Sequence, residues 1–111
     1  MGRQFNILEL EVLELAVEDW HGLWELPTDQ LEAVQAVVRE FMADGLVEVA
    51  TSEWPPRAFS VLDDNNALAM LANAANWRWP DENGTNPLVW VGATKAGRDQ
   101  HENRCRMNEG Q

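Results

Sequence analysis

Residues 27–51 constrain the fold of this chain more than any other stretch. A proline, one amphipathic helix, a glycine and an alternating strand follow one another there with no linker between them. Pro27 disfavours helix at the residue before it, and Gly45 suits the left-handed conformation that ends many helices. Asp29, with Glu32 three residues later, predicts a capping box at the helix start. The interval has room for one helix of about four turns. Helical spacing predicts its buried stripe as Leu31, Val34, Val37, Val38, Phe41 and Met42.

Helices and short strands alternate along the rest of the chain. In residues 5–20 the apolar side chains fall on one broad arc of a helical wheel, which favours a helix over a strand of that length. Residues 63–77 begin with good capping residues and predict another helix, and a short helix is expected to start at residue 95. Alternating or extended stretches predict strands at residues 23–26, 46–51, 58–62 and 88–94. The sequence therefore predicts an α+β fold with three to four helices and a small antiparallel β-sheet.

The length of 111 residues is that of one domain. We expect residues 1–100 to form a single domain and residues 101–111 to be a flexible C-terminal tail. The single cysteine, Cys105, fits a reducing compartment, and the first residues lack the features of a signal peptide. No apolar run approaches the roughly 18 residues of a membrane-spanning helix. The expected location is the cytoplasm, away from membranes, as a monomer or small oligomer.

Three stretches resemble parts of a winged-helix domain: "GLWEL" at residues 22–26, "FMADGLVEV" at residues 41–49 and "LVWVGATKAGRDQ" at residues 88–100. The last of them is similar to the wing strand and the T-x-x-G-R ending of many bacterial winged-helix regulators. The resemblance covers most of residues 5–100 and implies a winged-helix-like domain. An unrelated α+β domain, with helices on one face of a three-stranded sheet, is the alternative.

The chain departs from DNA-binding members of that family in its helices and in its charge. Those members place two helices between the first strand and the wing, whereas here the positioning helix is missing or reduced to a turn. The chain carries 19 acidic and 8 basic side chains, a net charge of −11, and residues 1–53 hold 12 of the acidic but 2 of the basic ones. Since DNA affinity comes largely from Lys and Arg neutralising phosphates, nucleic acid is a disfavoured partner.

No arrangement of residues typical of an active site is present in the sequence. His21 and His101 lie far apart in the chain, and Cys105 falls in the expected tail. The acidic stretches at residues 63–66 and 81–83 lack the alternating spacing and the closing glutamate of a calcium loop. The sequence therefore predicts no enzyme activity, no cofactor and no metal site.

Acidic side chains and tryptophans are the residues predicted to contact a protein partner. The acids of the first helix form one rib, for which a merely solvated face is the simpler interpretation. Those of the second helix alternate with small alanines that allow close approach, and tryptophans near prolines are suited to anchor an interface. The predicted partner-binding residues are Glu11, Glu14, Glu18, Asp29, Glu32, Glu40, Trp54, Trp77 and Trp79.

Together these features predict a non-catalytic acidic protein-binding module whose partner is a basic protein. Attraction between surfaces of opposite charge speeds the association of two such proteins. In size and charge the chain is similar to immunity proteins and antitoxins that inhibit basic, nuclease-like toxins. One alternative is a winged-helix DNA-binding transcription regulator. An adaptor subunit and a phage-encoded DNA-mimic inhibitor are further alternatives.

Overall fold

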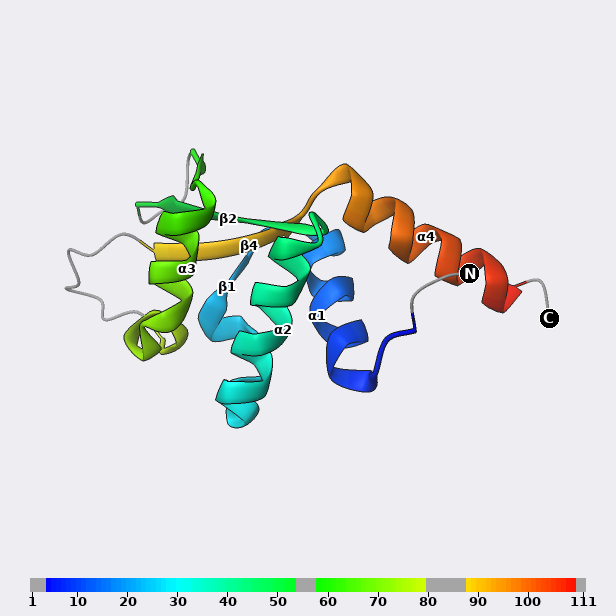
Figure 1. Ribbon diagram of the computed structural model, residues 1–111, viewed down its shortest axis with the longest axis horizontal. Coiled ribbons are helices and arrows are strands. Elements are labelled where there is room, and N and C mark those ends of the chain that lie inside the picture. The colour runs from blue at the N-terminus through cyan, green and yellow to red at the C-terminus, as the bar shows by residue number, and fades with distance from the viewer. Residues whose placement is uncertain (1–3, 54–57, 80–87, 110–111) are drawn as a thin grey trace.

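The computed structural model describes residues 4–53, 58–79 and 88–109, with the side chains of the last helix described as far as Asn103. Within these residues the chain is an α+β protein with four α-helices and a four-stranded antiparallel sheet (Figure 1), which confirms the predicted class. The helices are α1 (Ile7–Glu18), α2 (Leu31–Ala43), α3 (Asp64–Ala72) and α4 (Lys95–Glu109). The strands are β1 (His21–Gly22), β2 (Val47–Ser52), β3 (Ser60–Val61) and β4 (Leu88–Ala93). Three 3-10 turns complete the order: η1 (Leu23–Glu25), η2 (Thr28–Gln30) and η3 (Ala74–Trp77).

The sheet has the strand order β1-β4-β2-β3, and each neighbouring pair is antiparallel. β4 lies between β1 and β2 and pairs with β2 along its whole length. Side chains alternate across a strand, so the valines of β2 and β4 point to one face of the sheet and enter the buried core. Helices α1 and α2 lie on that side of the sheet (Figure 1). Those helices contribute Val12, Leu13, Val34, Val38 and Phe41, all buried in the same core. The predicted buried stripe of the second helix is confirmed at its centre, while Leu31 and Met42 are half-buried at its edges.

The other face of the sheet is covered by aromatic rings instead of a helix. Directly opposed residues on neighbouring strands share a face, and one such row joins Gly22, Trp90, Ala50 and Val61. The rings of Trp24 and Phe59 meet Trp90 edge to face, with centroids at 5.0 and 5.5 Å. Trp20 stacks on Phe59 and lies close over Gly92. Small residues in the strands therefore make room for aromatic rings that seal this face.

Helix α1 begins with a capping box that the sequence analysis did not predict. The Asn6 side chain accepts a hydrogen bond from the Glu9 backbone N–H at 2.8 Å, and the Glu9 carboxylate accepts one from the Asn6 N–H at 3.1 Å. The capping box predicted at Asp29 and Glu32 is wrong. One turn of 3-10 helix, η2, takes up Asp29, so that Gln30 becomes the cap residue of α2 and makes no side-chain cap bond.

Two other local predictions differ from the structure. The strand predicted at residues 23–26 is wrong: Leu23–Glu25 form η1, and the pairing with β4 is made by the two residues before it. The indole of Trp24 folds back over Gly22, where a Cβ would overlap the ring, and that packing requires a tight turn. The helix predicted at residues 63–77 is divided into α3 and η3, and the buried residues of α3 are Ala67 and Leu71.

Gly45 ends α2 as predicted, with a φ of +75°. The Gly45 N–H donates to the Met42 carbonyl at 3.1 Å, and the Leu46 N–H donates to the Phe41 carbonyl at 2.8 Å. These two bonds satisfy carbonyl groups that the helix end leaves open. The turn then leads directly into β2.

The T-x-x-G stretch at the end of β4 ties α4 to that turn. The Thr94 hydroxyl donates to the Gly45 carbonyl at 2.5 Å and accepts from the Gly97 N–H at 3.1 Å. The backbone of Gly97 packs so closely on Leu46 that a Cβ at this position would overlap the Leu46 carbonyl oxygen. From this attachment α4 continues to Glu109, beyond the short helix that was expected. The flexibility predicted for residues 101–111 stays a prediction.

Alanine at Gly45 and alanine at Gly97 are expected to destabilise the protein in different ways. Gly45→Ala meets no atom within 4 Å, so its cost is the left-handed backbone alone, about 1 kcal/mol of unfolding free energy. Gly97→Ala forces α4 away from Leu46 and is expected to cost about 1–3 kcal/mol. Urea unfolding measures both costs, and hydrogen exchange should show faster exchange in α4 for Gly97→Ala alone. Unchanged α4 protection in that variant would contradict the close contact.

Candidate functional site

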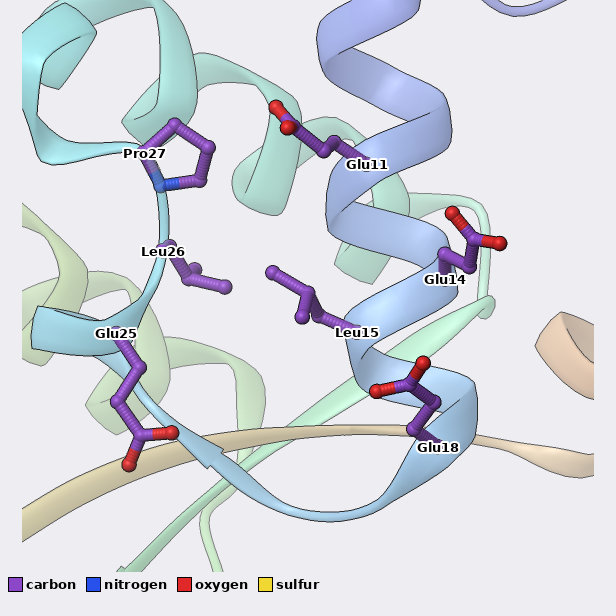
Figure 2. A pocket seen from close by; sticks show the side chains of 7 residues that line it. All are labelled: Glu11, Glu14, Leu15, Glu18, Glu25, Leu26 and Pro27. Atoms are coloured by element: carbon purple, nitrogen blue, oxygen red, sulfur yellow. The ribbon is translucent and has the colours of Figure 1, made fainter.

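An acidic hollow of about 370 Å³ lies between α1 and a facing segment formed by the last residue of η1 and the two residues after it. From α1 come Glu11, Glu14, Leu15 and Glu18, and from the facing segment come Glu25, Leu26 and Pro27. Figure 2 shows Leu15 and Leu26 pointing toward one another across the space, with the carboxylates placed around them. The hollow therefore has an apolar floor and four carboxylates at its rim.

Local structure on both sides explains why these residues meet. Residues three or four apart lie on one face of a helix, so α1 presents Glu11, Glu14 and Glu18 on its exposed side. After β1 the chain turns through η1 and buries Trp24 and Leu26. The residue between them must then point outward, and the Glu25 side chain is 36% exposed.

The electrostatics of the hollow are strongly one-sided. Among the described residues, the side chains of Glu11, Glu14 and Glu18 make no hydrogen bond or ion pair. Like charges at helical spacing repel, which costs a few tenths of a kcal/mol per pair. The apolar floor also lowers the local dielectric, which strengthens the field of the carboxylates at the rim. A long cationic side chain matches such a site, since its aliphatic stem can lie on apolar surface while its charged end reaches the acids.

The structure divides the predicted acidic residues into two groups. The three acids of α1 line the hollow. Asp29, Glu32 and Glu40 are also exposed, but they belong to η2 and α2 and do not line it. A partner seated in the hollow would therefore meet the α1 acids first.

The tryptophans predicted as interface anchors have different positions. Trp77 is 2% exposed, and its indole N–H donates to the Leu71 carbonyl at 2.9 Å. It is a core residue, because η3 turns it inward against the end of α3, so it offers no surface to a partner. Trp79 is 78% exposed, so its indole is accessible to a partner. Trp54 lies outside the described residues.

Glu25, Leu15, Leu26 and Pro27 are members of the hollow that the sequence analysis did not select. A pattern in the sequence pointed to Glu25: it stands alone between two large apolar residues, Trp24 and Leu26, which both favour burial. Its proximity to Glu18 was not readable from the sequence, because the two residues belong to different elements and meet only through the turn at β1.

Among the described residues, no three His, Cys, Asp or Glu side chains lie in a position to hold a metal ion. None of the helices in this part of the chain combines the length and apolar character needed to cross a membrane. Comparisons of the chain with protein-family models, curated proteins and solved structures gave no match.

Proposed function

We propose that this chain is a non-catalytic protein-binding module of winged-helix-like architecture, and that it inhibits a basic, nuclease-like protein in the manner of an immunity protein or antitoxin. The observation that carries the proposal is the acidic hollow, where four carboxylates surround an apolar floor. The partner inserts a lysine or arginine side chain there, and the wider acidic surface steers it to the site.

The order of elements supports the winged-helix-like part of the proposal. The sequence resemblance implies a helix, a strand, a second helix, and then two strands that flank a wing. In the chain α1, β1, α2, β2 and β4 follow in that order, and β4 pairs between β1 and β2. The positioning helix is replaced by η1 and η2, and α3 with η3 is inserted between β3 and β4 where a wing would lie.

The charge of α2 supports a protein partner over DNA. In a DNA-binding relative a helix at this position reads bases, which requires donors such as Arg, Lys, Asn or Gln. The exposed side of the helix and its preceding turn carries Asp29, Glu32 and Glu40, opposed by Arg39. Each carboxylate near a phosphate would reduce the affinity for DNA. Binding depends on basic side chains that neutralise phosphates and so release counterions into solution.

Affinity capture from the native host tests the proposal. The tagged chain is used as bait at low and at moderate salt, beside a bait carrying Glu14→Lys and Glu18→Lys. We expect the unmodified bait to retain one strongly basic protein at low salt and the variant bait to lose it. The recovered protein should cleave nucleic acid, and an equimolar amount of the chain should inhibit that cleavage.

Other outcomes would replace the proposal. Recovery of RNA polymerase or a ribosome by both baits would favour an adaptor subunit. A saturable, competitor-resistant mobility shift with genomic DNA at low salt would instead favour a transcription regulator.

A further inference from the structure

His21 lies in β1 with its side chain 17% exposed, beside Glu25 of the acidic hollow. Its Nδ1 is 3.0 Å from the backbone carbonyl oxygen of Asp19. A carbonyl oxygen only accepts hydrogen bonds, so Nδ1 carries the proton and donates it. The lone pair of the neutral ring is therefore on Nε2, which lies 4.0 Å from a carboxylate oxygen of Glu25.

We propose that His21 makes the acidic hollow sensitive to pH. When the ring is protonated it pairs with the Glu25 carboxylate, which lowers the affinity of the hollow for cationic side chains. The proton is added at Nε2, the atom that faces Glu25. The neutral ring has no donor for that carboxylate, whereas the protonated ring offers a charge-assisted one. This inference rests on the proposed function for its biological meaning, although the His21–Glu25 coupling is testable in the isolated protein.

The charged residues next to His21 in the chain are acidic. β1 pairs with β4, and β4 carries no titratable side chain. The residue opposite His21 on that strand is Val91. Along the chain, the titratable neighbours are Glu18, Asp19 and Glu25. The Asp19 carboxylate already accepts a hydrogen bond from the Trp20 N–H at 2.7 Å. Glu25 is the carboxylate placed to receive the new proton donor.

The consequence for the hollow follows from its charge. Four carboxylates line it when His21 is neutral. A protonated His21 adds one positive charge beside Glu25, which lowers the negative field that a cation meets. Binding of a cation should therefore weaken as the pH falls and the ring gains its proton.

Carbon-13 NMR of the free protein tests the coupling. In a pH titration, the Glu25 carboxyl resonance should show an inflection at the same pH as the His21 ring resonances. The same inflection should be absent in His21→Gln, in which the amide can still donate to the Asp19 carbonyl but does not titrate. A Glu25 resonance that ignores the titration of His21 would overturn the inference.

Binding of a hexa-arginine peptide tests the effect on the site. Its affinity is measured at pH 7.5 and at pH 5.5. We expect the affinity to fall about two- to threefold at the lower pH, the size of an exposed charge pair. His101→Gln, at the other histidine, should keep that fall and His21→Gln should abolish it.

The two proposals fail in different ways. A peptide that binds at pH 7.5 with an equal pH dependence in His21→Gln and in the unmodified protein overturns the role of His21 alone. A peptide that does not bind at pH 7.5 counts against the hollow as a cation site, and the NMR titration then still decides whether His21 and Glu25 are coupled.

Discussion

Replacing Trp77 with alanine is expected to lower the free energy of unfolding by about 3–5 kcal/mol, the usual cost of removing a large aromatic side chain from a core. Trp77 is 2% exposed in the main core cluster, where η3 packs against η1 and α3. Its indole also donates to the Leu71 carbonyl, which in addition accepts from the Gln35 side chain at 3.1 Å. The variant therefore loses packing and the one bond that joins the Trp77 indole in η3 to the end of α3. Urea unfolding followed by far-UV circular dichroism measures the loss.

Trp79→Ala is the matched control, two residues further along the same chain. Its side chain is 78% exposed, so the unfolding free energy should change by no more than about 0.5 kcal/mol. Equal losses in the two variants would show that Trp77 is not the core residue described. If Trp79 anchors a partner, Trp79→Ala should instead weaken binding of the protein recovered by capture.

Glu14→Lys combined with Glu18→Lys should slow association with the basic partner by roughly tenfold or more at low salt. Both side chains line the acidic hollow, and each substitution changes the charge by two, so the net charge moves from −11 to −7. The reversed charges stand where the partner's cation would enter, so the local field changes sign as well as size. Stopped-flow or surface-plasmon measurement of the association rate at several salt concentrations gives the effect, which should shrink as salt is added.

Asp29→Lys combined with Glu32→Lys separates the hollow from the total charge. This pair changes the net charge by the same amount, but the residues lie at η2 and α2, outside the hollow. We expect a smaller decrease in the association rate than for the α1 pair. An equal decrease would show that overall charge, and not the hollow, steers the partner, and no decrease in either variant would reduce the α1 rib to a solvated surface.

Predictions from sequence succeeded where local rules decide. Gly45 ends α2 because a glycine accepts a positive φ, and Val34, Val37, Val38 and Phe41 are buried because their spacing matches the helical period. The capping box shows the limit of such rules: Asn6 and Glu9 fit the pattern and form it, while Asp29 and Glu32 fit equally well and do not. A single extra 3-10 turn, whose formation depends on how Pro27 and its neighbours pack, shifts the second helix start.

The candidate site was predictable in part. Exposure of Glu11, Glu14 and Glu18 follows from the apolar arc on the other side of α1. The hollow beside them does not, since it requires Glu25 and Leu26 to be brought opposite α1 by the turn through β1. The approach of His21 to Glu25 likewise depends on that turn.

The sequence by itself determined the α+β class, the acidic character of the first half of the chain and the faces that α1 and α2 bury, because composition and helical periodicity are local properties of the chain. The tertiary structure alone decided which of two neighbouring tryptophans is buried, and which acids share a hollow. Those outcomes depend on surfaces that lie far apart along the chain and meet only after the strands have paired. The free energy of burying a side chain depends on the neighbours that cover it as well as on its own type, so the residue type alone cannot specify it.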